Sequence, residues 1–159
     1  METDINSKLS KIIDNINGQD IKLVNVDFFA TADKAGSFND KNIKSNLNIQ
    51  LQNIGTGEAQ NSDGTKSPIM YGNYKFDLKY SGETASENLI KIVISYKLVV
   101  NLQDDIENII ENGIKEVLQI FFDNTGRIIL YPYFRHLCDL LIRESSFILP
   151  PLPPLSLIS

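Results

Sequence analysis

The chain has few of the residue types that carry catalysis. One histidine, His136, and one cysteine, Cys138, occur among its 159 residues. They stand two positions apart, a spacing that points helical side chains in different directions, so the sequence argues against a Cys-His catalytic pair. The chain also lacks a Gly-x-Ser-x-Gly motif, a His-Glu-x-x-His motif and a dinucleotide-binding fingerprint. We therefore predict a protein that is not an enzyme and that uses no cofactor and no metal ion.

Three further absences limit the possible location of the chain and the classes of partner that it could bind. Its net charge is −5, and it has no cluster of Lys and Arg, which argues against nucleic acid as a partner. The apolar runs are too short to span a membrane, and Met1-Glu-Thr-Asp4 is too acidic to begin a signal peptide. A single cysteine cannot close an internal disulfide. These features predict a cytoplasmic protein without an inserted membrane segment.

Two acidic pairs allow two interpretations. Asp104 with Asp105, and Glu107 with Glu111, have the composition of an acid/base pair or of a metal site. The same residues suit a helix N-terminus, where carboxylates meet free backbone N–H groups, and a solvated helix face. We favour the second interpretation, which assigns these residues no chemistry.

Apolar spacing predicts a short helix followed by four strands. Residues 5–16 repeat apolar groups at three- and four-residue intervals, as an amphipathic helix does. The period then changes to two, and it is strict around Leu47, Ile49 and Leu51, which alternate with Asn and Gln. The predicted strands are 21–29, 47–51, 74–80 and 89–102, with a flexible loop at 55–68 that is rich in Gly, Asn and Ser. They describe an antiparallel sheet connected by hairpins or as a Greek key.

The last third of the chain predicts helices. An apolar stripe runs from Ile106 to Phe122. We expect Asn124-Thr-Gly126 to stop or kink the helix, and Pro132 to lie in the first turn of a second one. The predicted helices are 104–123 and 132–145, and they cover one face of the sheet. The predicted fold class is α+β.

A proline-leucine tail follows, Leu149-Pro-Pro-Leu-Pro-Pro-Leu155. Proline removes backbone donors and fixes an extended backbone, so this tail joins neither a helix nor a central strand. Its leucines need apolar cover. Two interpretations stay open: a strap across the core of the domain itself, or one wall of an apolar groove.

The order of these parts resembles SecB-type protein-export chaperones. The most specific match is Ile128-Ile-Leu-Tyr-Pro-Tyr-Phe-Arg135, which is similar to the family's Asn-Leu/Ile-Leu-Phe-Pro-Tyr-Ala-Arg segment. Phe147 to Leu157 follows at the distance of the family's Gly-Phe-Pro-Pro-Leu segment. Upstream, Gln19-Asp-Ile-Lys-Leu23 looks like the beginning of the family's first strand, and Asn46-Leu-Asn-Ile-Gln-Leu51 is similar to its second. The resemblance covers approximately Leu9 to Leu157.

The resemblance implies a fold and an activity. The expected fold is a four-stranded antiparallel Greek-key sheet with long helices packed on one face. It forms a single SecB-like domain over 1–159, with an N-terminal helix or arm at 1–19, the sheet at 20–103, helices at 104–147 and the proline-rich tail at 148–159. Family members are tetramers, dimers of dimers, that hold unfolded polypeptides in hydrophobic grooves without ATP and pass them to the SecA motor. The width of the Ile106-to-Phe122 stripe also favours a homo-oligomer.

Candidate site residues follow from the resemblance and the apolar pattern together. The predicted walls of the client groove are Leu47, Ile49, Leu51, Leu152 and Leu155. Asp20 matches the acidic surface that the family presents to the motor, but Val24 stands where an acid is usual, and 89–93 lacks the expected glutamate. The chain also stops at Ser159, before the family's last helix and motor-binding tail. We therefore predict weak or no binding to SecA.

The identity of the client stays open between a preprotein and an antitoxin, because shortened SecB-like proteins also serve toxin–antitoxin pairs. A different class of function is the alternative: a carrier of small hydrophobic ligands or a hotdog-like enzyme, since such folds also wrap a sheet around a hydrophobic helix. An enclosed pocket with convergent polar groups would favour this alternative, whereas an open apolar groove would favour the chaperone.

Overall fold

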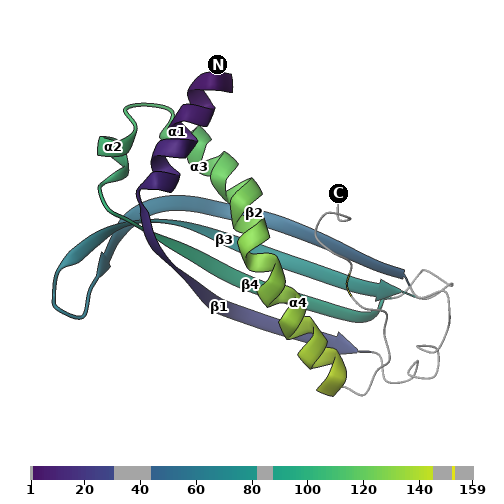
Figure 1. Cartoon of the computed structure of the whole chain (residues 1–159). Helices are drawn as coiled ribbons and strands as arrows, with labels where there is room; N and C mark the ends of the chain where they lie inside the picture. The colour runs from purple at the N-terminus through teal and green to yellow at the C-terminus, as the bar shows by residue number, and fades with distance from the viewer. Residues whose placement is uncertain (1, 31–43, 82–87, 145–151, 153–159) are drawn as a thin grey trace. The chain divides into compact units, whose positions relative to one another are not determined.

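The structure of the chain is a computed structural model, and it describes residues 2–30, 44–81, 88–144 and 152. A helix is followed by four strands, and the remaining helices come after the last strand (Figure 1). The elements are α1 (Glu2–Asp14), β1 (Ile16–Ala30), β2 (Lys44–Gln60), β3 (Lys66–Ser81), β4 (Asn88–Leu102), α2 (Ile106–Ile109), α3 (Ile114–Phe121), the π-helix η2 (Phe122–Gly126) and α4 (Arg127–Glu144).

The four strands form one antiparallel sheet in the order β1-β4-β3-β2. Three consecutive strands, β2, β3 and β4, are neighbours, and β1 lies beside the last of them. This is a Greek-key arrangement, which the resemblance implied and which the residue pattern had left open against plain hairpins. The predicted α+β class and the antiparallel Greek-key sheet are confirmed.

The chain divides into two compact units, and each strand contributes a segment to both. The described residues of unit 1 are 2–22, 51–74 and 96–127, and those of unit 2 are 23–30, 44–50, 75–81, 88–95, 128–144 and 152. In unit 1, α1 lies against α2 and α3. In unit 2, α4 lies over the sheet (Figure 1), and the ring of Phe76 packs on that of Phe134 with 4.7 Å between centroids.

The predicted loop at 55–68 is wrong. Strand β2 continues to Gln60, β3 begins at Lys66, and only a short turn separates them. The misleading signal was glycine: a Cβ on Gly55 would come within 2.5 Å of the Tyr71 hydroxyl, because that ring lies across the strand. Glycine here permits a close approach within a sheet rather than a flexible loop.

The turn itself is tightly hydrogen-bonded. The Asn61 N–H donates to the Thr65 carbonyl at 2.7 Å, and Gly64 adopts a left-handed backbone with φ of 86°. The Thr65 hydroxyl and N–H donate to the Asp63 carboxylate. These bonds, the hydroxyl's first, lower the pKa of Asp63 below its usual value.

The predicted helix at 104–123 is interrupted where no break was expected. α2 is a single turn, Ile110 is extended, and Gly113 has a left-handed backbone with φ of 70° before α3 begins. Conversely, the helix does not stop at 124–126, because the chain passes through the π-helix directly into α4. A π-helix adds a residue to a turn without ending the helix.

Packing against a buried tyrosine explains the π-helix. The Tyr74 hydroxyl donates to the carbonyl of Phe122 at 2.5 Å, and a Cβ on Gly126 would collide with that hydroxyl. Pro132 consequently lies inside α4 and not in its first turn as predicted. Burial first, and the Asp123 charge second, raise the pKa of Tyr74, so this donor keeps its proton.

Candidate functional site

The predicted groove residues of β2 share one face of that strand. Leu47 and Leu51 are half-buried, and Ile49 is 8% exposed, whereas the intervening Asn48 and Gln50 are exposed. The alternation that the sequence predicted is therefore present. Whether this apolar row binds a client stays a prediction.

Hydrogen bonds between β2 and β3 fix which residues lie opposite one another. The Asn61–Thr65 bond at the turn and a side-chain bond from Asn73 to Asn53 belong to a single antiparallel register. In that register the odd-numbered residues of the two strands lie on the same face. Carried two residues at a time along both strands, it places Asp77 opposite Ile49.

Unit 2 shows which face this is. The even-numbered residues of β3 turn toward α4, since Phe76 packs on Phe134, and Tyr80 lies near Cys138. Successive residues of a strand point to opposite faces. Leu47 and Ile49 therefore lie on the face of the sheet that is turned away from α4, a placement that the sequence pattern did not reveal.

Charged residues border this apolar row. Lys75, Asp77 and Lys79 alternate along β3 on the same face as Leu47 and Ile49. All three are half-buried, and the Oδ1 atom of Asp77 is buried without a hydrogen-bond partner. A buried unpaired carboxylate oxygen is uncommon in folded proteins, so this border is the chemically least satisfied part of unit 2 among the described residues.

The remaining predicted site residues are Leu152, Leu155 and Asp20. Leu152 in the tail is buried, with 3% exposure, and Leu155 lies outside the described residues. Asp20 is an exposed residue of β1 in unit 1. Val24, on the same strand, is 63% exposed.

Sequence reasoning missed a set of exposed apolar side chains. Among the described residues, the large apolar side chains of unit 2 that face solvent are Leu23, Val24, Phe29, Ile128, Tyr133 and Leu140. The signal was readable in β1, where apolar residues occupy both alternating positions of 23–29 instead of one. On α4 no signal distinguished Tyr133 from the buried Phe134 beside it.

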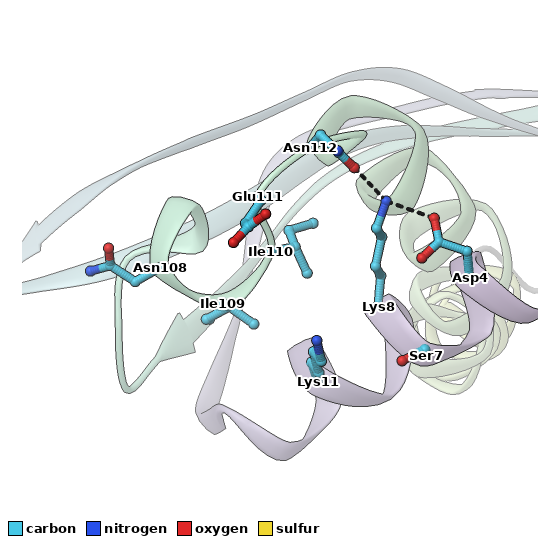
Figure 2. Close-up of a pocket in the computed structure, with 9 residues that line it drawn as sticks. All are labelled: Asp4, Ser7, Lys8, Lys11, Asn108, Ile109, Ile110, Glu111 and Asn112. Carbon is cyan, nitrogen blue, oxygen red and sulfur yellow. Dashed lines mark hydrogen bonds and ion pairs between the residues drawn. The ribbon is translucent and has the colours of Figure 1, made fainter.

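Two pockets of unit 1 bear on the alternative of a small hydrophobic ligand. The first, of about 500 Å³, lies between α1 and the 108–112 segment (Figure 2). Within it the Lys8 ammonium donates to Asn112 at 2.7 Å and pairs with Asp4 at 2.9 Å. A second pocket of about 300 Å³ includes the carboxylates of Glu58, Asp105 and Glu107 among its lining residues. Charged and amide groups of this kind suit water better than an apolar ligand.

The thiol and the imidazole that the sequence singled out are held apart. His136 is exposed on α4, and Cys138 is fully buried. Burial raises the pKa of Cys138, which keeps the thiol protonated. Within 2–30, 44–81 and 88–144 no group of three or more acidic, His or Cys residues is placed to hold a metal ion. In the same ranges no helix is both long and apolar enough to cross a membrane.

Comparison with known proteins identifies the fold. No protein-family model and no curated protein matches the chain. Among solved structures it matches the Mycobacterium tuberculosis Rv1957 SecB-like chaperone in complex with a ChAD peptide from the Rv1956 HigA1 antitoxin, with a TM-score of 0.62, 14% identity, and coverage of 92% of this chain and 94% of that one. The resemblance read from the sequence is thus confirmed at the level of architecture: this chain has the fold of the SecB-like chaperones.

Proposed function

We propose that the chain is an ATP-independent chaperone that holds unfolded polypeptide segments against apolar surface. The observation that carries this proposal is the group of solvent-facing apolar side chains in unit 2. A soluble chain rarely exposes such a group unless something binds there. An unfolded client presents apolar side chains and unpaired backbone, and an apolar surface takes both without reading sequence. Holding a client in this way requires no catalytic group.

The edge strand β1 of the described sheet supports the same proposal. β1 is an edge strand of 15 residues, paired on one side with β4. Edge strands are usually short or protected by charge and proline. This one is long, and beside the charged Lys22 and Asp27 it exposes Val24 and Phe29. We propose that a second copy pairs along this edge, and that two such dimers form a homotetramer. Light scattering at micromolar concentration tests the assembly, and a monomer alone would contradict it.

The client is proposed from the nature of the surface. The solved neighbour was captured with a peptide from an antitoxin, and both an antitoxin and a preprotein present extended apolar segments. We propose that such a segment lies along the row Leu47, Ile49 and Leu51, with Leu152 and Leu155 contributing from the tail. We also propose that longer clients contact the exposed apolar side chains of β1 and α4 in unit 2. The proposed location is the cytoplasm.

We propose that the chain binds the SecA motor weakly or not at all. Asp20 is available on β1, but Val24 is an exposed apolar residue where the family has an acid. Lys91 lies in the β4 stretch where a glutamate was expected. Losing one side of a charge contact lowers both on-rate and affinity. Calorimetric titration against purified SecA measures this directly, and submicromolar affinity would refute it.

Suppression of aggregation tests the holding activity. A chemically unfolded reporter protein is diluted into buffer without nucleotide, with and without the chain, and its light scattering is followed. We expect an equimolar amount of the oligomer to suppress scattering, because the exposed apolar surface competes with client self-association. Serum albumin at the same mass concentration controls for nonspecific protection. Full aggregation in the presence of the chain would overturn the proposal.

A further inference from the structure

The β3 and β4 segments of unit 2 carry three lysines on the sheet face that is turned away from α4. Lys75 and Lys79 lie on this face of β3. Lys91 lies on it in β4, because its neighbours Ile90 and Ile92 are fully buried on the other face. Asp77 is the acidic group of β3 among them, so these four residues carry a net positive charge although the chain carries −5.

Among the described residues, no carboxylate pairs with these lysines. None of the three forms an ion pair or a hydrogen bond in the part of the chain that the structure describes. Each is half-buried, which means that its aliphatic stem is partly covered by neighbouring groups while the ammonium group has no carboxylate partner. Lys8 of unit 1 is different, because it is held by Asp4 and Asn112.

The same face carries the apolar row of β2. The register that places Asp77 opposite Ile49 also places Lys79 opposite Leu47. Opposite residues on one face of an antiparallel pair have Cβ atoms about 4.5–5.5 Å apart. A segment lying on Leu47 and Ile49 would therefore pass within reach of the lysine side chains.

We propose that this face selects client segments in which apolar residues are flanked by carboxylates. The lysines supply charge complementarity, and the apolar row supplies affinity that does not depend on charge. Asp77 lies between Lys75 and Lys79 on the same face of β3. Its negative charge disfavours a carboxylate at the centre of the segment, so the carboxylates of a client should lie at the flanks. This inference rests on the proposed holding function and specifies the chemistry of the client.

Four fluorescein-labelled peptides of equal length test the proposal by anisotropy. Three share the same leucines and valines and differ in the flanking residues, which are Glu, Gln or Lys, and the fourth keeps Glu but replaces the apolar residues with Ser. At low ionic strength we expect the Glu-apolar peptide to bind at least about tenfold more tightly than the Lys-apolar peptide. That ratio should shrink above about 0.1 M salt, where the screening length falls to about 10 Å. The Glu-Ser peptide should bind more weakly than the Glu-apolar peptide.

Charge variants assign the preference to this face. Lys75→Glu/Lys79→Glu should reverse the order of the Glu and Lys peptides, and Lys75→Gln/Lys79→Gln, which perturbs folding less, should abolish it. Lys11→Glu/Lys115→Glu changes the net charge equally on exposed residues of unit 1 and should leave the order intact. A Lys-apolar peptide that binds as well as the Glu-apolar one, or a preference unchanged in both 75/79 variants, overturns the inference while the holding function stands. Failure of every apolar peptide to bind overturns both.

Discussion

Units 1 and 2 are built on segments of the same four strands, yet they differ in how many large apolar side chains they expose among the described residues. Among the described residues, Ile13 is the exposed large apolar side chain of unit 1, while unit 2 has six. Unit 1 also contains the ion pairs Lys8–Asp4, Lys66–Glu58 and Arg127–Asp123. Its surface is occupied by local polar contacts, whereas that of unit 2 keeps apolar groups in solvent.

The buried and the exposed apolar side chains have different expected roles. Burial of Tyr74 and Phe122 in unit 1, and of Phe76 and Phe134 in unit 2, stabilises the fold in the ordinary way. Exposed Val24 and Tyr133 contribute nothing of that kind. We therefore expect the solvent-facing apolar residues to make unit 2 the region that binds a client, and the experiments below test this expectation from the largest expected effect to the smallest.

The largest effect is expected inside α4. Phe134→Ala removes a fully buried ring that packs on Phe76, and it should lower the free energy of unfolding by about 3–5 kcal/mol. Leu140→Ala on the same helix removes an exposed side chain and should cost less than about 0.5 kcal/mol. Urea denaturation followed by circular dichroism measures both. Similar losses would show that Leu140 is covered in solution, which fits an oligomer contact and not a client surface.

The π-helix of unit 1 should be the next most sensitive point. Gly126→Ala places a methyl group against the Tyr74 hydroxyl and ring, and overpacking of this kind costs about 1–3 kcal/mol. Tyr74→Phe alone leaves the Phe122 carbonyl without its donor, a loss of about 1–3 kcal/mol.

In the double variant the two losses should add to less than their sum, because removal of the hydroxyl makes room for the methyl group. Thermal melts of the two single variants and the double variant close this cycle. Strict additivity would show that the two residues do not meet in solution.

The dependence of stability on alkaline pH tests whether the Cys138 thiol is buried in unit 2. Burial raises its pKa in the folded chain above the unfolded value of 9.0, so its contribution to stability is complete below pH 9 and is lost as pH rises further. We expect the stability of the wild type to fall more steeply between pH 9 and 10 than that of Cys138→Ala. The buried tyrosines Tyr74 and Tyr80, whose pKa values burial also raises, act mainly above pH 10 in both proteins. Parallel pH profiles would argue that the thiol reaches solvent.

The smallest effect is expected at α1. Lys8→Met removes the bonds to Asp4 and Asn112, and because Asp4 is largely exposed the cost should not exceed about 1 kcal/mol. Peptide binding should be unchanged, because Lys8 belongs to unit 1. Denaturation midpoints together with anisotropy check both statements. A weaker peptide affinity would contradict the assignment of the binding surface to unit 2.

The strand alternation was the most predictable part of this structure. Leu47, Ile49 and Leu51 were assigned to one face from sequence, and β4 was placed almost residue for residue. The prediction failed where a residue's role is set by a distant partner. Gly55 was interpreted as loop because Tyr71, which packs across it, is remote in sequence. Likewise the helix does not stop at Gly126, because the close approach of the Tyr74 hydroxyl accounts for that glycine.

The candidate site was only half predictable. Period-two spacing identifies a wet and a dry face of β2, but it cannot say on which side of the sheet α4 lies, since that depends on packing between elements remote in sequence. The charged border was missed for the same reason: Lys75, Asp77 and Lys79 are unremarkable until the β2–β3 register sets them beside Leu47 and Ile49. Asp20 was recognised by resemblance alone, and no described contact distinguishes it.

Suppression of aggregation by matched surface variants tests most directly whether unit 2, and not unit 1, holds the client. Val24→Thr/Ile128→Gln/Tyr133→Gln removes exposed apolar groups of unit 2, and Ile13→Gln/Lys11→Gln/Lys115→Gln alters exposed positions of unit 1 equally often. Each change should alter stability by less than about 0.5 kcal/mol, which melting curves verify. We predict that the unit 2 variant loses at least half of the protection of an unfolded reporter while the unit 1 variant keeps it. Full protection by the unit 2 variant, or equal losses in both, would contradict the account.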